Sequence, residues 1–267
     1  MFFNGEKLYL VAEQDYCQSM GYVFTSRGGK VVVIDGGTAD EAAVLEEYLL
    51  RAGKEVEAWF ITHAHYDHLG AAVQILRGNK VDIKRFCFAF PEFSWLEKTE
   101  PNDAPHTAAL LREIAARNIP VEPLRKGKEF VFDSLKITAL NDAETDFQSQ
   151  TVNNSTVALD VKTSGASVLF LGDMERESGD RLVAAYPDLH RDIVQVAHHG
   201  NRGVGKNVYE HVRPRVCLWN TPVWLWNNDD GGGYDSGSWT TLETRRWAKE
   251  LGVEENIVSK DGCREIV

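Results

Sequence analysis

Short apolar runs alternate with amphipathic stretches along most of the chain. The first 35 residues or so contain three apolar runs divided by Gly and Ser turns, a pattern typical of a meander of short strands. We predict these strands at 8–13, 21–26 and 30–37. The next stretch, 38–53, repeats its apolar residues at helical spacing. Thr38 and Glu41 form a capping-box pattern at its start, and Gly53 is a typical helix stop, so we predict a helix there.

The rest of the chain repeats this order, in which an apolar strand ends in a polar motif and a helix follows. We predict further strands at 57–62, 81–90, 128–140, 155–173, 192–200, 213–220, 256–260 and 263–267, with turns inside the longer ranges. Further helices are predicted in the second half of 63–78 and at 103–118, 174–187 and 238–252. Two similar halves of alternating strands and helices indicate an α/β protein. No linker divides them, so we predict one domain over residues 1–267.

Composition narrows the classes of protein that this chain can be. Its 29 Lys and Arg against 40 Asp and Glu give a formal charge of −11, which argues against a surface that coats nucleic acid. No apolar run reaches the roughly 20 residues of a membrane helix, and the first residues do not resemble a secretory signal. The four cysteines are scattered without a C-x-x-C pair. We therefore expect a cytoplasmic protein with reduced thiols and no membrane partner.

Five of the eight histidines fall in two short motifs, and the first motif is dense in metal-binding groups. In an extended segment, residues two apart point the same way, so His63 and His65 can converge on one point. The chain then turns, and Asp67 and His68 can reach a second point nearby. Imidazole and carboxylate suit zinc, manganese or iron, whereas the lack of Cys ligands disfavours a structural zinc site. We interpret the motif as a metal site rather than as a solvated polar loop.

Two later motifs supply further ligands. Asp173 ends an apolar run at a Gly-Asp pair, where a carboxylate could bridge two cations or merely end a turn. His198 and His199 follow another strand and can complete the second metal site. Neighbouring residues in an extended segment point to opposite sides, so we expect one ligand from this pair. We prefer His198, which comes first after the strand, and leave His199 to contact the substrate or hold the loop.

Together, the motifs at 62–70, 172–173 and 198–200 resemble those of the metallo-β-lactamase superfamily of hydrolases. The stretch 153–201 is similar to the hydrolase domain of bacterial DNA-uptake channel proteins and their soluble relatives, such as phosphorylcholine esterases. The resemblance implies a four-layer αββα sandwich with a dinuclear metal site at one edge of two sheets. It implies that one ion takes His63, His65 and Asp173. The other ion would take Asp67, His68, Asp173 and one histidine of the pair.

The resemblance also implies residues that support the metal ligands, and it shows one position at which this chain differs from most of the superfamily. Asp35 matches the superfamily's first acidic position and is expected to hydrogen-bond a ligand or its loop. Most members carry another His ligand between the first motif and the Gly-Asp pair, where this chain has only His106. We interpret His106 as part of the surface or the cleft wall. In the expected region, 151–155, an asparagine oxygen or water could replace the missing ligand, and we assign Asn154 as a supporting residue.

These residues predict a hydrolase that uses two divalent ions, with zinc preferred over manganese or iron. A metal-bound hydroxide would attack a small anionic substrate, most simply a phosphodiester or a related ester. Asp67 would bind metal and orient the nucleophile, while His199 would protonate the leaving group. The alternatives are a thioester or other ester hydrolase of the same fold and a metal-binding scaffold without turnover.

The stretch 222–239 is rich in glycine and aromatic residues. One interpretation is that its rings pack in the core and in a loop, as large aromatic side chains commonly do. The other is that they form a substrate wall, possible for a long loop of this kind and suited to a quaternary ammonium group. We prefer the packing interpretation.

Overall fold

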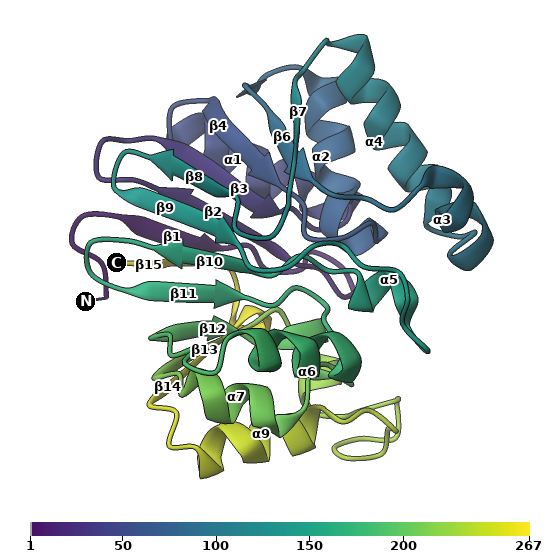
Figure 1. Ribbon diagram of the computed structural model, residues 1–267, viewed down its shortest axis with the longest axis vertical. Helices are drawn as coiled ribbons and strands as arrows, with labels where there is room; N and C mark the ends of the chain where they lie inside the picture. The colour runs from purple at the N-terminus through teal and green to yellow at the C-terminus, as the bar shows by residue number, and fades with distance from the viewer. Residues whose placement is uncertain (1) are drawn as a thin grey trace.

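Two β-sheets face each other in the computed structural model, which describes residues 2–267 (Figure 1). The first sheet has its strands in the order β15 (Arg264–Ile266), β1 (Lys7–Leu10), β2 (Gly21–Thr25), β3 (Val31–Asp35), β4 (Glu55–Phe60), β6 (Phe86–Phe88) and β7 (Val121–Pro123), with β5 (Asp82–Ile83) also paired to β4. The second sheet has the order β14 (Glu255–Val258), β13 (Val216–Trp219), β12 (Ile193–Gln195), β11 (Ser167–Phe170), β10 (Leu159–Lys162), β9 (Leu135–Ala139) and β8 (Glu129–Phe132).

Helices cover the outer face of each sheet. Those beside the first sheet are α1 (Ala42–Arg51), α2 (Tyr66–Gly78), α3 (Phe93–Thr99) and α4 (Ala104–Ala116). Those beside the second sheet are α6 (Arg176–Ala185), α7 (Lys206–Val212) and α9 (Thr241–Glu250). The short helices α5 (Thr151–Asn154) and α8 (Val223–Trp226) lie in loops. The layer order is helix, sheet, sheet, helix, which confirms the predicted αββα sandwich.

The inner strands, such as β3, β12 and β13, are buried on both faces, and this explains why their sequences are continuous apolar runs. In β3, Val32 and Ile34 point between the two sheets, while Val31 and Val33 point towards the helices of the first half. Each sheet has an antiparallel part and a parallel part, so the two halves resemble each other as the sequence predicted. In the parallel part of each half, the carboxyl ends of the strands meet at one edge.

The predicted helix boundaries hold where a capping signal was present. Thr38 and Glu41 form the expected capping box, followed by a short 3₁₀ turn and α1. The sequence did not reveal α3, α5, α7 or α8, which have seven residues or fewer and therefore show too little helical periodicity. None of the helices in residues 2–267 is long and apolar enough to cross a lipid bilayer.

Candidate metal centre

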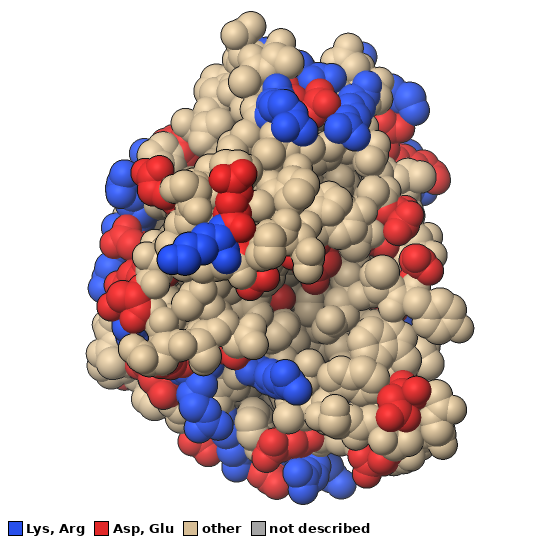
Figure 2. All heavy atoms as spheres, turned by 90° about the vertical axis from the view of Figure 1, so that its right-hand side faces the viewer, with Lys and Arg blue, Asp and Glu red and all other residues tan. Residues whose placement is uncertain are grey.

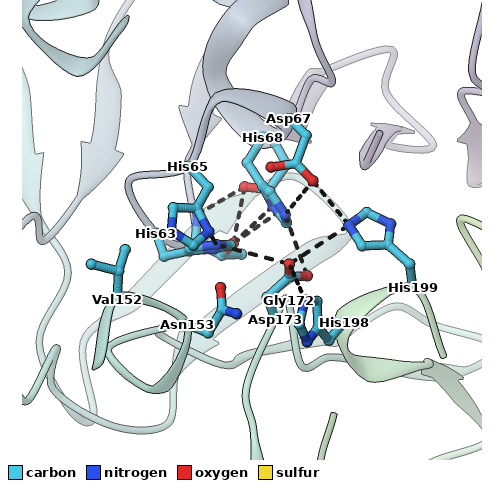
Figure 3. A network of polar contacts seen from close by, with 12 residues as sticks. His63, His65, Asp67, His68, Val152, Asn153, Gly172, Asp173, His198 and His199 are labelled. Atoms are coloured by element: carbon cyan, nitrogen blue, oxygen red, sulfur yellow. Dashed lines mark hydrogen bonds and ion pairs between the residues drawn. The ribbon is translucent and has the colours of Figure 1, made fainter. Parts of the chain in front are cut away.

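Polar side chains from both halves meet where parallel strands end. Asp35 is the last residue of β3, and the first histidine motif follows β4. Asp173 follows β11, and the His198–His199 pair follows β12. Figure 3 shows the side chains of the two histidine motifs and of Asp173 turned towards one another, although the first motif lies more than 100 residues before the others. Figure 2 looks onto this edge of the molecule, where Asp and Glu atoms lie in a hollow.

The first motif spans the junction between β4 and α2. His63 lies in the connecting loop, His65 is the N-cap residue of α2, and Asp67 and His68 lie in the helix's first turn. A carboxylate in the first turn of a helix is favoured by the helix dipole. The turn thus separates the two histidines of the loop from the Asp67–His68 pair, as the spacing predicted.

Four residues form the first candidate ligand group: Asp67, His68, Asp173 and His199. Their ligand atoms all lie within 4.8 Å of one another. Nε2 of His199 lies 3.1 Å from Oδ2 of Asp67 and 3.6 Å from Oδ2 of Asp173. Nε2 of His68 lies 3.3 Å from Oδ1 of Asp173. Two imidazoles and two carboxylates therefore point at one small volume.

The second candidate group contains His63, His65 and Asp173, so Asp173 belongs to both groups. Nε2 of His63 lies 3.1 Å from Nδ1 of His65 and 4.0 Å from Oδ2 of Asp173. Without a cation, two imidazole nitrogens this close can share at most one proton. The bridging position of Asp173 is the one that two neighbouring ions would require.

Asp35 and Thr62 lie beneath the first motif and fix its geometry. The backbone N–H of Thr62 donates to Oδ1 of Asp35 over 2.8 Å. Nδ1 of His68 lies 2.9 Å from Oδ2 of Asp35, so a proton on Nδ1 leaves Nε2 free to face the cluster. Asp35 is completely buried and lies where the sequence analysis expected a supporting carboxylate.

The second histidine motif adopts a backbone that the sequence analysis did not foresee. His198 and His199 have φ values of 49° and 54°, so they form a left-handed turn and not an extended segment. This turn directs His199 into the four-residue group. His198 lies beside it, with Nδ1 3.2 Å from Glu175 and Nε2 3.8 Å from Asp173. The geometry therefore favours His199 as the ligand, opposite to our preference.

Asn153 and not Asn154 faces the cluster. The side chain of Asn154 donates to the carbonyl of Ser149, and its oxygen accepts from the backbone and hydroxyl of Ser178. Asn154 therefore holds α5 against α6. Asn153 is buried beside the second group, and within residues 2–267 its Oδ1 has no hydrogen-bond partner (Figure 3). The sequence analysis placed an asparagine in this region but assigned Asn154, whereas the geometry places its neighbour Asn153 beside the cluster.

Other residues near the cluster were either missed or set aside. Glu175 follows the Gly-Asp pair by two residues and contacts His198, and no sequence signal marked it. Glu100 lies 3.8 Å from Nε2 of His65, on the side away from His63. His106 belongs to α4, is exposed and stacks on Tyr66 with ring centroids 4.1 Å apart, and it lies outside both ligand groups. Its exposed position outside both groups agrees with the interpretation of His106 as part of the surface or the cleft wall.

Without metal, burial and neighbouring charges shift several pKa values in the cluster far from their ordinary values. Burial lowers the pKa of His63 well below its ordinary value, and the neighbouring His68 and His65 add to this. Burial also opposes charge on His68, but the carboxylates of Asp173, Asp35 and Asp67 outweigh it and raise its pKa well above the ordinary value. Burial likewise opposes ionisation of Asp173, yet the surrounding imidazoles hold its pKa well below the usual range.

The unpaired atoms test whether these residues fit a metal. Within residues 2–267, Nε2 of His68 and Oδ1 of Asp173 are buried and have no hydrogen-bond partner, although they lie 3.3 Å apart. Buried polar atoms normally find a partner, since leaving one unpaired costs about 1–3 kcal/mol. The donor set of imidazole and carboxylate is the one that first-row divalent ions prefer. The residues present therefore fit a metal centre.

This chain belongs to the metallo-beta-lactamase superfamily, whose family pattern matches residues 15–202. Among curated proteins, ComE operon protein 3 of Bacillus subtilis (strain 168) is 26% identical over 207 residues. That match covers 71% of this chain but only 25% of the relative, so the chain spans about a quarter of that protein's length.

Solved structures show the same fold at low sequence identity. The metallo-beta-lactamase fold protein YhfI from Bacillus subtilis is 13% identical with a TM-score of 0.59, covering 98% of this chain and 99% of that one. CmlA, a diiron beta-hydroxylase from Streptomyces venezuelae, is 11% identical with a TM-score of 0.60, covering 98% of this chain and 54% of that one. A fold shared with a hydroxylase does not by itself define the reaction, which must be argued from the site.

Proposed function

We propose that this protein is a metal-dependent hydrolase that acts on a phosphodiester or a related anionic ester. The observation that carries the proposal is the pair of ligand groups, His63–His65–Asp173 and Asp67–His68–Asp173–His199, joined by one shared carboxylate. A purely structural metal site is normally closed by four protein ligands, often cysteines. Here the side chains of Asp67 and His65 remain 25% and 16% exposed, so the cluster is open to solvent on one side.

Two divalent ions held by these groups would lower the pKa of a bound water and polarise an oxygen of the ester. The chain's own residues would do the remaining work. Asp173 would hold both ions in place, and Asp67, which lies 3.1 Å from His199, would orient the attacking oxygen. His198 is the imidazole left outside both groups, and its Nε2 lies on the cluster side, 3.8 Å from Asp173. We assign His198 the role of donating a proton to the leaving oxygen.

The charge balance favours an anionic substrate. Two divalent ions bring four positive charges to a cluster whose ligand carboxylates, Asp67 and Asp173, carry two negative ones, and the buried Asp35 beneath it carries a third. The loaded site is therefore positive within a chain of net charge −11. An anion is attracted to this positive site, and this concentrates a phosphodiester at the metal edge. The reacting carbonyl of a β-lactam or a thioester is itself uncharged, so it gains less from the same field than a phosphate group does.

A substrate panel with a matched variant tests the proposal. The chain, loaded with Zn²⁺ or Mn²⁺, is assayed with bis-p-nitrophenyl phosphate, p-nitrophenyl phosphorylcholine, a β-lactam and a thioester. We expect turnover of the phosphate esters and a loss of at least about 100-fold in Asp67→Asn. Asp82→Asn, an exposed carboxylate on β5, is the control and should retain full activity. Turnover of the thioester alone would overturn the phosphodiester assignment.

A metal-binding scaffold without turnover is the second candidate, and Asn153 favours it. The group His63–His65–Asp173 has three donors, and an asparagine stands beside it in the region where the resemblance to the superfamily implies a further His ligand. Metal analysis separates the two functions. Two equivalents of bound metal with no turnover across the whole panel indicate a scaffold, whereas turnover that is lost in Asp67→Asn indicates an enzyme.

A further inference from the structure

A cavity of about 830 Å³ lies between α9 and the glycine-rich loop that follows α8. Its walls carry three aromatic residues, Trp226, Tyr234 and Trp239. They also carry three basic residues, Arg245, Arg246 and Lys249, against the two carboxylates of Asp235 and Glu243. Every residue that lines this cavity comes after residue 202, where the match to the superfamily ends. The cavity is therefore a feature of this chain beyond the part shared with the family pattern.

The loop over the cavity is held in one shape by a buried asparagine. Asn228 is 4% exposed and has a φ of 52°. Its side-chain amide donates to Oδ1 of Asp235 and to the carbonyl of Gly237, and its side-chain oxygen accepts from the backbone N–H of Trp239. One side chain thus closes the loop on itself. The rings of Tyr234 and Trp239 are placed by this closure, so the wall is formed before any ligand arrives.

The aromatic rings differ in how much of their surface is already covered by other side chains. Trp226 packs edge-on against Trp219. The guanidinium carbon of Arg245 lies over the Trp226 ring, 4.1 Å from the ring centroid. Arg245 is further fixed because it donates to the carbonyl of Trp226. Trp239 contacts only Trp224 among the aromatic pairs of residues 2–267, and Tyr234 is 69% exposed. Trp239 and Tyr234 therefore offer ring surface to a ligand.

Two of the basic groups are free to bind an anion. Arg246 and Lys249 are three residues apart on α9, and both are exposed. The neighbouring ion pairs, Lys206–Glu250 and Arg215–Glu254, do not include them, and no other salt bridge within residues 2–267 does. Guanidinium and ammonium groups without a carboxylate partner are the usual receptors for phosphate.

We infer that this cavity binds a planar aromatic anion of the size of a nucleoside monophosphate. The ring stacks on Trp239 and Tyr234, a contact worth about 1–3 kcal/mol per base in proteins that bind bases by stacking. The phosphate pairs with Arg246 and Lys249. The volume lies within the range of sites for single small molecules, about 300–1,000 Å³. This site stands independently of the proposed hydrolase function.

The surroundings favour a single nucleotide over a polymer. Asp229, Asp230 and Asp235 lie along the same loop, and the chain as a whole carries a charge of −11. A nucleic-acid strand needs a continuous basic track along its backbone, and these acidic groups interrupt one. The cavity also adjoins the histidine loop, because Thr240 on its wall donates its backbone N–H to Asn201, two residues after His199.

Tryptophan fluorescence tests the inference with three probes. Adenosine monophosphate, adenosine and inorganic phosphate are titrated against the full chain in the presence of EDTA, which keeps the metal centre out of the readout. We expect saturable quenching by the nucleotide, at least 10-fold weaker binding of adenosine, and no quenching by phosphate. In the double variant Arg246→Ala/Lys249→Ala, the affinity for the nucleotide should fall at least 10-fold. Arg112→Ala, an exposed arginine on α4, is the matched control and should bind as the unaltered chain does.

A ring variant separates loss of the site from loss of the fold. Trp239→Leu should remove nucleotide binding, and Trp239→Phe, which keeps a stacking surface, should restore most of it; both are read by calorimetry because the reporter is altered. Three results would overturn the inference: no saturable binding of the nucleotide at millimolar concentration, equal binding by the Arg246→Ala/Lys249→Ala variant, or tighter binding of a single-stranded oligonucleotide than of the mononucleotide.

Discussion

Oδ2 of Asp35 lies 2.9 Å from Nδ1 of His68, and both side chains are completely buried. A carboxylate in this position keeps the proton on Nδ1 and presents Nε2 of His68 to the cluster. Asp35→Asn removes the charge that fixes this arrangement. We expect metal affinity to fall by about 10–100-fold, as measured by competition with a chromogenic chelator.

A control must separate this effect from general loss of stability. Asp160 on β10 is also buried and pairs with Arg191, but it belongs to neither ligand group. Asp160→Asn should lower the melting temperature and leave metal affinity unchanged. If both variants lost metal affinity to the same degree, Asp35 would have no specific role in orienting His68.

Asn153→His should complete the weaker ligand group. It adds an imidazole beside His63, His65 and Asp173, where the buried Oδ1 of Asn153 has no hydrogen-bond partner within residues 2–267. We expect the second equivalent of metal to bind at least about 10-fold more tightly, because imidazole is a stronger ligand for zinc than an amide oxygen. Mass-spectrometric metal analysis after dialysis against a weak chelator measures this directly.

The neighbouring asparagine provides the matched control. Asn154→Ala removes the acceptor of the backbone N–H of the buried Ser178 and the shorter of the two hydrogen bonds of its hydroxyl, which keeps the carbonyl of Glu175 at 3.3 Å. Its free energy of unfolding should fall by about 1–3 kcal/mol, while its metal content should stay that of the unaltered chain. An Asn153→His variant with unchanged metal content would show that this side chain does not face the second ion.

The sequence could predict the strands and the α/β class because they depend on local patterns, whereas the four layers were implied by the resemblance to the superfamily. Apolar runs such as Val31–Ile34 marked strands that are buried on both faces, and the Thr38–Glu41 capping box marked the entry to α1. The short helices were not predicted, because seven residues or fewer make at most two turns and show too little helical periodicity. Their positions depend on tertiary contacts that no local pattern records.

The candidate site was predictable as a set of residues but not in its geometry. The spacing of His63, His65, Asp67 and His68 gave two groups separated by a turn, and the structure shows both. Which of His198 and His199 points into the ligand group could not be predicted, because this depends on two consecutive residues with left-handed backbone. Such a backbone is rare outside glycine, and here Gly200 leaves room for the ring of Trp219.

Metal binding should release protons at neutral pH. Burial alone would lower the pKa of His199, but Asp173 and Asp67 outweigh it and raise the pKa to about 10 in the metal-free protein. At pH 7.5 this imidazole therefore carries a proton that a metal must displace. Calorimetric titration with Zn²⁺ in two buffers of different ionisation enthalpy should give different apparent enthalpies. His199→Gln should release fewer protons, and identical enthalpies in both buffers would contradict the assignment.

The same pKa values set the pH dependence of stability without metal. A raised pKa on His199 contributes stability that is complete below its unfolded value near 6.5 and is lost as pH rises towards about 10. The lowered pKa of Asp173 contributes stability above its unfolded value near 3.8, which is lost as pH falls. In EDTA the melting temperature should therefore be higher at pH 6 than at pH 9.5. A flatter profile in His199→Gln would trace the difference to this imidazole.

Gly172 should tolerate no side chain, because it lets the loop of Asp173 reach the first motif. It has a φ of 51°, and an added Cβ would lie 2.7 Å from a methyl of Thr156 and 2.9 Å from the hydroxyl of Thr62. Gly172→Ala should lower the free energy of unfolding by about 1–2 kcal/mol for the left-handed backbone and about 1–3 kcal/mol more for the contacts. Gly127→Ala has a φ of 79° with open space around its Cβ, so it should show only the first part. Chemical unfolding of both variants measures the difference between their free energies of unfolding. Only Gly172→Ala should also bind metal more weakly, because only there would Asp173 move relative to His63 and His68.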